Sequence, residues 1–596
     1  MAYADELVND QYKGNVVIRI NGGAYYARHQ PDSGLTVAAS NRILDKFGIN
    51  PQVISLEDAK TTFGSVTFTL VDLGGVITSL FNNNMTLFMG QEVEIWLGRI
   101  TGSLAFSDYL KLQKFRISRV TFKNEEYSFT AQEITADFKK AVFNTKALLN
   151  ADTSAGAGSL VMATDIAAFP SSGKLFLEDE LIAYSAKNDG TKTFTLTGTL
   201  ANDHGEGTEV LNVTTITNQN PLDILLRILQ STGGGTYDSY AEGLGVVDAD
   251  LDIAGIEAIR DATFAGELFS FELFGIENAL EFMEAEILKP CSLRFVPSSG
   301  NKLSLTVLDT SIFGAATKTL DADNIDHKSI QYEVNTESVK NTITIEYGYD
   351  YATGKYSRTH SETDAESVTN YGAKDPFIIQ SKGIPATSGG DAIATDRALR
   401  WLARLSTATP SISVSTFFNT SLALIGERVL LTYDLPTETG DRLFSKELEI
   451  IKKSIDENKG IVKFDLAFTN YSGLRECFIS PTSPVNGYTD AQALFFVDEA
   501  ELVKWKVGYL LRVRRADGTD HGPYKIESMM ANGAFSRIDC EGTGPVEVAS
   551  GWRLKYADYD DTVGGDSMHV DQRRYGYVSD GAGNFADGSR PYQITF

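Results

Sequence analysis

Apolar and polar residues alternate with a period of two along most of the chain, which is the pattern of half-buried β-strands. In the segment SVTFTLVD, Val66, Phe68 and Leu70 fall on one face and two threonines on the other. The same alternation recurs in VEIWL, YSFTA, LSLTVL, TITIEY and IVKFDLAF. Polar turns such as 123–125 and 457–460 separate these strands. The pattern predicts a mainly β protein.

Helical periodicity is confined to three segments. One helix is predicted to begin at Asn220-Pro221, because Asn is a favoured cap and Pro is tolerated at the first helical position. Its apolar stripe consists of Leu222, Leu225, Leu226 and Leu229. A second helix is predicted over 276–289, before a proline, and a third over about 392–405. We expect all three stripes to pack in a core.

Two regions repeat one succession of strands. Residues 93–138 and 429–468 each contain a strand, a polar loop, a long strand, a tight Asn/Glu turn and an aromatic-bearing strand. Each region is preceded by a further alternating strand. We interpret the two regions as copies of one domain and expect them to superpose. The alternative is a chance likeness between two hairpin-rich segments.

Composition and pattern together divide the chain into several domains. Residues 146–162 are rich in Ala, Ser and Gly, as linkers are, and residues 480–486 are polar and contain proline. We predict a first β-barrel at 1–145, which later strands could complete, a linker and small β insert at 146–215, an α+β domain at 216–320, a second, similar β-barrel at 321–470 and a C-terminal β-rich domain at 471–596.

Charge and cysteine content narrow the classes of partner. The chain has 596 residues, with 53 Lys and Arg against 79 Asp and Glu, and a formal net charge of −26. Such a chain repels phosphate backbones, so stable binding of DNA or RNA is not expected. Cys291, Cys477 and Cys540 lie far apart, which predicts neither a disulfide framework nor a thiolate metal site. No signal peptide and no apolar run of ~18 residues is apparent.

No catalytic, cofactor-binding or metal-binding constellation stands out, so we expect no enzyme, no cofactor and no site residues. The histidines are scattered singly, at His29, His204, His327, His360, His521 and His569. No G-x-S-x-G elbow, HExxH pair or Walker sequence occurs. For Cys477, a packed thiol is favoured over a dyad with a distant histidine. Paired carboxylates of a glycosidase stay open, because their spacing is spatial rather than sequential.

Two acidic runs and a glycine pair are superficially similar to ligand-binding motifs. The run 248–252 begins like a calcium loop, but its sixth and twelfth positions hold Ile253 and Ile259 instead of Gly and Glu. The run 558–561 has no better spacing. The glycines of 243–245 have neither a third glycine nor a preceding strand. We interpret the first two as solvated acidic turns and exclude a dinucleotide loop for the third.

Four stretches carry a more specific pattern: QVISLEDAKTTFGSVTFTLVD through FMGQEVEIWLG, GKLFLEDELIAYS with the downstream HGEG, NTITIEYGYD, and LALIGERVLLT with the hairpin that ends in FDLAF. Together they span roughly residues 50 to 470. In these stretches the chain resembles the baseplate-hub family of tailed bacteriophages and related gene-transfer particles.

The resemblance implies a homotrimer in which two similar barrels per chain form a six-fold-like ring. Such a ring joins the hexameric tail tube to a three-fold tip and forms part of the DNA exit channel, through which DNA passes without specific binding. The implied partners are the tail tube, distal tail proteins, tail-tip or fibre proteins and the host envelope. The implied location is the tail tip of a virion assembled in the host cytoplasm. Some relatives carry a lysozyme or peptidase domain, and none is recognisable here.

Two other functions stay open at this point. A receptor- or glycan-binding tail protein could use the aromatic residues of the C-terminal region, which are Trp505, Trp552, Tyr556, Tyr559, Tyr575 and Tyr577. A cell-wall-degrading tail hydrolase could hide in a β-rich scaffold. The position of the protein in the particle distinguishes a receptor-binding protein from a hub, and a turnover assay on cell-wall material distinguishes a hydrolase from a hub. The host, the tail type and the neighbouring subunits have no signature in the sequence.

Overall fold

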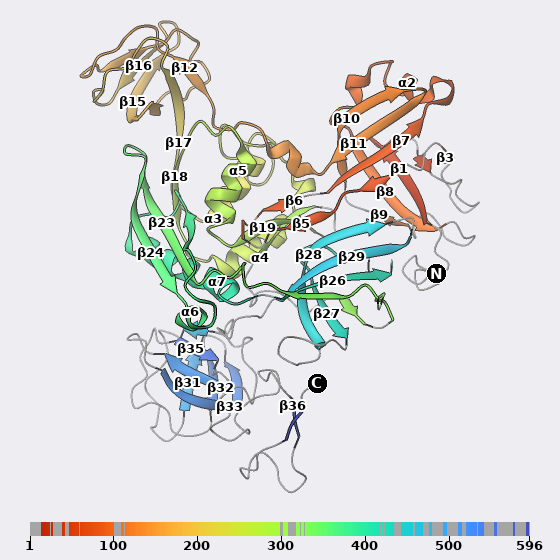
Figure 1. Ribbon diagram of the computed structural model, residues 1–596. Coiled ribbons are helices and arrows are strands. Elements are labelled where there is room, and N and C mark those ends of the chain that lie inside the picture. Colours follow the sequence, from red (N-terminus) through yellow and green to blue (C-terminus); the bar gives the residue numbers. More distant parts are fainter. Residues whose placement is uncertain are drawn as a thin grey trace.

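The computed structural model describes most of residues 14–468 and, beyond 468, mainly the strands (Figure 1). Besides single residues and short stretches, the gaps before 468 are 28–38, 42–46, 100–108, 308–317 and 434–442. Strands far outnumber helices among the described residues and are distributed over several separate sheets. The prediction of a mainly β, multidomain chain is confirmed.

The first sheet is built from residues 14–132, in the order β3-β2-β1-β8-β10-β11-β7-β4 with β9 paired to β8. Its strands are β1 (Gly14–Ile20), β2 (Tyr25–Ala27), β3 (Ala39–Asn41), β4 (Gly48–Ile49), β7 (Ser65–Val71), β8 (Glu92–Arg99), β9 (Leu110–Lys111), β10 (Phe115–Lys123) and β11 (Glu126–Gln132). The predicted inner face of β7 is buried, and the ring of Phe68 stacks on Phe129 at 4.9 Å.

The second sheet follows the order β21-β27-β28-β29-β26-β22, with β5 paired to β28 and β6 to β5. Its strands are β5 (Gln52–Ile54), β6 (Thr61–Thr62), β21 (Lys318–Leu320), β22 (Gln331–Val334), β26 (Pro410–Phe417), β27 (Arg428–Tyr433), β28 (Leu443–Asp456) and β29 (Ile461–Phe468). Buried side chains of both sheets, such as Phe68 and Phe464, belong to one continuous hydrophobic core. The two sheets therefore pack as one body.

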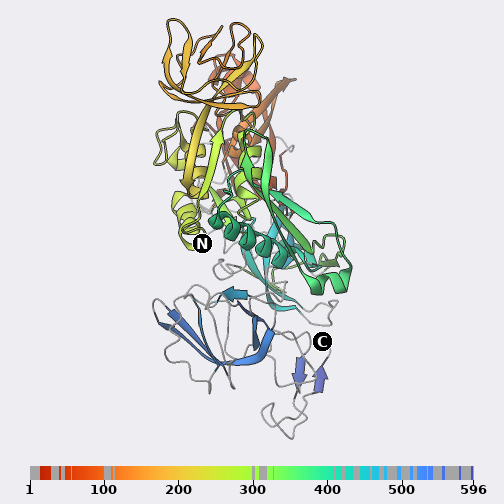
Figure 2. The same cartoon turned by 90° about the vertical axis from the view of Figure 1, so that its left-hand side faces the viewer.

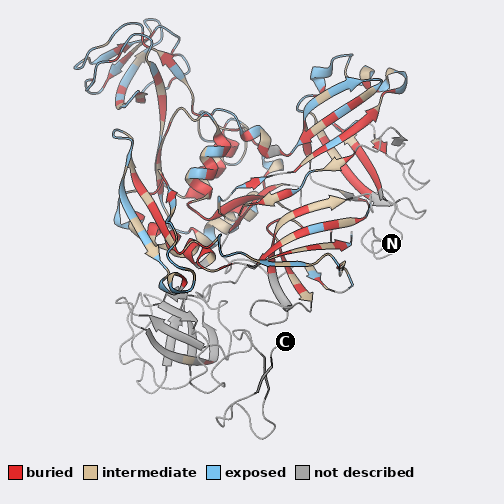
Figure 3. Ribbon diagram, in the orientation of Figure 1, coloured by how far each residue is buried: buried red, intermediate tan, exposed pale blue. Residues whose placement is uncertain are grey.

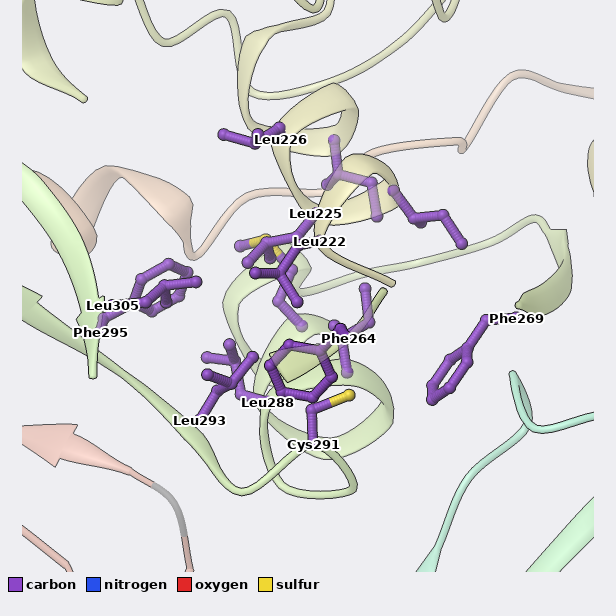
Figure 4. Close-up of a cluster of buried hydrophobic side chains, with 14 of the residues drawn as sticks. Leu222, Leu225, Leu226, Phe264, Phe269, Leu288, Cys291, Leu293, Phe295 and Leu305 are labelled. Atoms are coloured by element: carbon purple, nitrogen blue, oxygen red, sulfur yellow. The ribbon is translucent and has the colours of Figure 1, made fainter. Parts of the chain in front are cut away.

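A central domain lies beside the two sheets (Figure 1). Its helices are α3 (Pro221–Gln230), α4 (Ile253–Thr263), α5 (Ala279–Met283) with a π-helical turn (Glu284–Leu288), α6 (Ala365–Tyr371) and α7 (Ser388–Leu405). Its strands are β18 (Phe269–Leu273), β19 (Leu293–Pro297), β20 (Leu303–Val307), β23 (Thr342–Asp350), β24 (Lys355–Thr363) and β25 (Phe377–Gln380). The core surrounds α3, where Leu222 and Leu225 lie near Phe264 and Leu288 (Figure 4). Burying each such leucine contributes about 1.5–3 kcal/mol.

Caps decide where the helices begin. Asn220 Oδ1 accepts a hydrogen bond from the Leu222 amide at 2.9 Å, which confirms the predicted start of α3. The second helix begins three residues later than predicted, because Asn278 caps it. The third begins earlier, at a cap by Thr387. Helix α4 was not predicted, although Asp252 caps it through the Gly255 amide at 3.2 Å.

The central domain contains a segment that we expected in the second barrel. Residues 335–409 leave the second sheet after β22 and return at β26, and in between they place Ile343 and Trp401 in the central core. The expected single range 321–470 is corrected accordingly. The physical reason is that β22 and β26 still pair with each other, so an excursion between them leaves no mark on strand alternation.

The small β insert has a sheet and a core of its own. Its strands are β12 (Lys146–Leu148), β13 (Ser159–Val161), β14 (Gly173–Leu177), β15 (Glu180–Asn188), β16 (Thr193–Leu196) and β17 (Glu209–Gln219). Residues 146–162, predicted as a linker, instead contribute β12 and β13, and their small residues form the turns between. The long strand β17 continues out of the insert and pairs with β18, which connects the insert to the central domain.

The C-terminal region contributes further strands at the end of the molecule opposite the insert (Figures 1 and 2). They are β30 (Glu476–Phe478), β31 (Ala493–Val497), β32 (Leu510–Arg514), β33 (Asp520–Asn532), β34 (Phe535–Cys540), β35 (Arg553–Tyr556), β36 (Gly576–Val578) and β37 (Tyr592–Ile594). In the described part of the chain, no helix is both long enough and apolar enough to cross a bilayer.

Two glycines, one just before β8 and one just before β27, offer a test of the packing between the second sheet and the central domain. Gly90 and Gly426 both have a left-handed backbone, with φ of +75° and +81°. A Cβ at Gly426 would lie 2.9 Å from Val296 Cγ1, whereas one at Gly90 would meet nothing within 4 Å. We expect Gly90→Ala to cost about 1–2 kcal/mol through its backbone alone. Gly426→Ala should cost about 1–3 kcal/mol more through overpacking, measured by urea unfolding. Equal losses would contradict this interpretation.

Candidate assembly surfaces

The two sheets share one strand order. In the first sheet, β8, β10, β11, β7 and β4 are neighbours in that order, and in the second, β27, β28, β29, β26 and β22 are. Corresponding neighbours are antiparallel in both sheets. The predicted correspondence between 93–138 and 429–468 is thereby confirmed at the level of topology, and it extends to the preceding strands.

The strand registers also correspond. Val93 lies opposite Phe115 in the first sheet, and Val429 lies opposite Leu448 in the second. Each central hairpin carries a register shift at the same place. In β10 the shift falls between Ile117 and Arg119, six and four residues before the last paired residue, Lys123. In β28 it falls between Ile450 and Lys452, six and four residues before Asp456.

The same backbone turn precedes both β8 and β27. The Gly90 amide donates to the Ile117 carbonyl at 2.8 Å, and the Gly426 amide donates to the Ile450 carbonyl at 2.8 Å. The next residue accepts in return, from the amides of Ile117 and Ile450, at 3.0 Å in each case. Identical bulges and identical turns at corresponding positions are not expected of two unrelated hairpins. We therefore interpret the two sheets as a duplication.

A hairpin from the first sheet crosses to the second. Residues 50–64, which contain β5 and β6, leave β4, pair with β28 and return to β7. Thr61 Oγ1 at the far side donates to the Phe295 carbonyl at 2.7 Å, so the hairpin also contacts the central domain. We call residues 50–64 the crossing hairpin. It joins both sheets and the central domain within one chain.

A buried carboxyl lies where the crossing hairpin leaves the first sheet. Gln52 Nε2 donates to Glu133 Oε1 at 2.7 Å, and Glu133 is almost wholly buried. Burial raises the pKa of Glu133 to about 8, against the opposing effect of hydrogen bonds from Gln52 and the Gly64 amide. In the π-helical turn after α5, burial also raises the pKa of Glu284 to about 7, although Lys60 and Lys139 lower it.

Buried charges join the second sheet to the central domain. Arg404 Nη2 on α7 contacts Glu449 Oε2 on β28 at 2.7 Å, and the Glu449 side chain is fully buried. Arg428 lies directly opposite Glu449 in the ladder and is buried as well. Burial, and then the nearby Arg404, lowers the pKa of the wholly buried Arg294 on β19 to about 9, while Glu449 raises it. One carboxylate thus faces several guanidinium groups.

The loop between β7 and β8 presents an uncharged apolar surface, which we call the apolar cap (residues 73–89). It contains η1 (Leu73–Gly75), α2 (Val76–Leu80) and η2 (Met85–Phe88), and no Asp, Glu, Lys or Arg. Half of the exposed large apolar side chains among the described residues lie in it: Leu73, Val76, Leu80, Met85, Leu87 and Met89. The corresponding stretch 418–427 is about half as long, and among the described residues the apolar cap occurs once. Exposed apolar surface of this kind marks a binding region.

An aromatic cleft of about 400 Å³ lies between the insert and the central domain. The ring of Phe176 from β14 stacks on Phe274 at 4.2 Å, and Tyr351 contacts the edge of Phe274. Lys382 lies over the ring of Tyr349 at 5.0 Å, and Glu272 lines the same cleft. No feature of the sequence pointed to this cleft, because its walls come from four separate segments.

The residues with potential chemistry have structural partners where they are described. The ring of His204 lies between Glu178 Oε2 at 3.1 Å and Glu180 Oε2 at 3.3 Å, and it connects the β14–β15 turn to the loop between β16 and β17. Burial raises the pKa of the Cys291 thiol to about 12, which makes it a poor nucleophile. No group of three His, Cys, Asp or Glu suited to a metal occurs in the described part of the chain.

The acidic run 248–252 is structural as well. Asp248 accepts hydrogen bonds from Gln230 and Thr236, which lower its pKa, and Asp252 caps α4. Asp250 forms an ion pair with Arg116 at 3.4 Å, which connects the central domain to the first sheet. The side chains of Cys477 and of the C-terminal aromatic residues, and the whole run 558–561, lie outside the described part.

No protein-family model and no curated protein matches the chain. Among solved structures, prophage tail protein gp18 from Listeria monocytogenes is 11% identical, with 77% of this chain and 95% of that protein covered and a TM-score of 0.35. A tail protein from Neisseria meningitidis is 9% identical, with 77% and 99% covered and a TM-score of 0.37. The 43 kDa tail protein of prophage MuSo2 from Shewanella oneidensis is 10% identical, with 76% and 98% covered and a TM-score of 0.37. These three neighbours are tail proteins.

The buried ionic junction predicts one large and one small loss of stability. Glu449→Gln removes the carboxylate that faces Arg404, Arg428 and Arg294, so we expect a loss of about 3–5 kcal/mol in the free energy of unfolding. Lys459→Met breaks the exposed pair with Asp456 in the same sheet and should have little effect. Urea unfolding of both variants checks this. Similar small effects would show that the junction does not hold the second sheet.

The buried Glu133 predicts a pH-dependent stability. Its pKa is raised from 4.5 to about 8 in the folded chain, so the unfolded chain releases the proton first as the pH rises. The contribution of Glu133 to the free energy of unfolding therefore falls between about pH 4.5 and 8. Glu133→Gln should remove this fall. As the pH rises through that range, its free energy of unfolding should increase relative to that of the unmodified chain by a few kcal/mol. Parallel pH profiles of the two proteins in urea unfolding would contradict the assignment.

Proposed function

We propose that this chain is a structural hub of a phage tail tip, which joins a six-fold tail tube to a three-fold tip. The observation that carries the proposal is the pair of sheets with one strand order, one register, one bulge position and one glycine turn. A six-fold surface can meet three chains only if each chain offers two equivalent surfaces. The duplicated sheets supply two such surfaces within one chain.

The way the two sheets are joined supports the same role. They share a hydrophobic core, and the crossing hairpin pairs with β28, so their relative position is determined within the single chain. A ring made of three such units would hold six sheets at regular positions, and rings of identical chains close by rotation. We therefore propose a homotrimer.

The acidic composition fits a channel for DNA. Three copies would carry a formal charge of three times −26, or −78. A neutral or negative channel wall lets DNA pass, because a basic one would hold the phosphates. We propose that the ring forms part of the DNA exit channel and that DNA crosses it without specific binding.

The proposed partners are the tail tube and distal tail proteins on one side of the ring and tail-tip or fibre proteins on the other, with contact to the host envelope at infection. The apolar cap supports binding to a neighbouring protein, because uncharged apolar surface is costly to leave in water. It occurs once in the described part of the chain, so a trimer would present three equal sites. The proposed location is the tail tip of the virion, assembled in the host cytoplasm, and no catalytic role is proposed.

The aromatic cleft favours one second candidate, a receptor- or glycan-binding tail protein. Aromatic rings beside carboxylates form a pocket of the kind that binds small ligands. The cleft lies at the insert, whereas the aromatic residues considered from the sequence lie in the C-terminal region. Variants at Tyr349 and Tyr351 would test whether the cleft has a role in adsorption to cells.

Imaging of the assembled particle tests the hub. We expect three copies of the chain around the tail axis, with six sheet positions in one ring, because only that count matches a six-fold neighbour to a three-fold one. A tag on the C-terminal region identifies the chain in the averaged density. Six or twelve copies, or a position away from the axis, would contradict the proposed hub function and favour the receptor-binding alternative.

A further inference from the structure

The outer edge of β10, on the side away from β11, is paired only at its beginning. Phe115 and Arg116 pair with β8, and Ile117 bonds to the turn before β8. From Ser118 to Lys123, no strand among the described residues pairs with this edge. Arg119 and Phe122 are exposed there. Such an edge is a template for the addition of another strand.

The second sheet contains the corresponding edge, and there it is occupied. By the shared register, Arg119 and Val120 correspond to Lys452 and Lys453. These two lysines pair, antiparallel, with Val53 and Gln52 of β5, which comes from the neighbouring first sheet. Lys453 is accordingly buried, whereas Val120 is only half-buried. In a chain with two copies of one sheet, the occupied edge indicates what the open edge accepts.

The segment that corresponds to β5 follows from the same register. Gly48 pairs with Thr67 in the first sheet as Gln331 pairs with Ser413 in the second. Strand β5 begins four residues after Gly48, so its counterpart begins four residues after Gln331, at 335–337. Those three residues are exposed at the end of β22.

We propose that residues 335–337 of one copy add as an antiparallel strand to the outer edge of β10 in a second copy. Thr336 then lies opposite Arg119 and Asn335 opposite Val120, as Val53 lies opposite Lys452 and Gln52 opposite Lys453. The inference rests on the proposed ring and names the contact that closes it. The contact from first to second sheet is made within the chain, and the contact from second to first sheet is made between chains.

The charges on the two segments are complementary. The edge of β10 carries Arg119 and Lys123, and the incoming segment carries Glu337, with Glu333 just before it in β22. Opposite charges on two surfaces favour their encounter. In the single chain, Asn335 Oδ1 accepts from the Glu337 amide at 2.8 Å, so pairing must exchange this local turn for ladder hydrogen bonds. The ladder hydrogen bonds must therefore outweigh the loss of this turn.

Cysteine crosslinking of the full-length chain tests the pairing. Arg119→Cys and Thr336→Cys are introduced together, in a background with Cys477→Ser and Cys540→Ser, and the concentrated protein is oxidised. We expect a covalent trimer, seen on a non-reducing gel and lost on reduction. When two single variants are mixed, only the mixture of Arg119→Cys with Thr336→Cys should give a covalent dimer.

Two control pairs sharpen the result. Val53→Cys with Lys452→Cys has the same geometry within one chain, so it should crosslink without any increase in mass. Phe122→Cys with Thr336→Cys is three residues out of register and should give at least ten-fold less product. Equal product from both intermolecular pairs would overturn the proposed register.

The outcomes separate this inference from the proposed function. A particle with three copies on the tail axis, or a trimer by light scattering, that gives no product from Arg119→Cys with Thr336→Cys overturns the edge pairing alone. A chain that stays monomeric and gives no product also overturns it. A covalent trimer from a chain that lies off the tail axis supports the pairing and overturns the hub.

Discussion

The arrangement of the two sheets depends on one constraint: the backbone groups along an open strand edge need hydrogen-bonding partners. The outer edge of β28 receives that partner from the crossing hairpin, which starts and ends in the first sheet. This one pairing places two sheets over a shared core and brings Thr61 against the central domain. Without it, β28 would expose a long edge suited to non-specific association. Figure 3 shows buried positions along the strands of both sheets, and these side chains belong to one core.

Buried charge adds specificity to this hydrophobic contact. Glu449 has no access to solvent and faces Arg404 from the central domain and Arg428 from the neighbouring strand. An apolar junction would tolerate sliding, whereas a buried carboxylate among guanidinium groups is costly in any other position. Glu133 is also buried, where the crossing hairpin leaves the first sheet, and it accepts a hydrogen bond from Gln52 of that hairpin. We infer that the two sheets and the central domain behave as one rigid unit.

The two copies are similar in backbone geometry and differ in the surface segments attached to them. The two copies keep the bulge and the glycine turn, which determine the shape of each sheet. They differ in their attachments: among the described residues the apolar cap belongs to the first, and the second is interrupted by the central-domain segment 335–409. Equal shapes with unequal attachments suit a part that meets six-fold symmetry on one side and three-fold symmetry on the other.

The sequence alone determined the features that depend on neighbours in the chain. Alternation revealed strands such as β7, β23 and β29, and a capping Asn before a Pro placed the start of α3. The repeated order of strand, turn and aromatic strand revealed the duplication. Tertiary structure decided where 335–409 packs, which sheet β5 joins, and which partners Glu449 and His204 find. These contacts join segments tens to hundreds of residues apart, and burial in a shared core, rather than any local pattern, selects them.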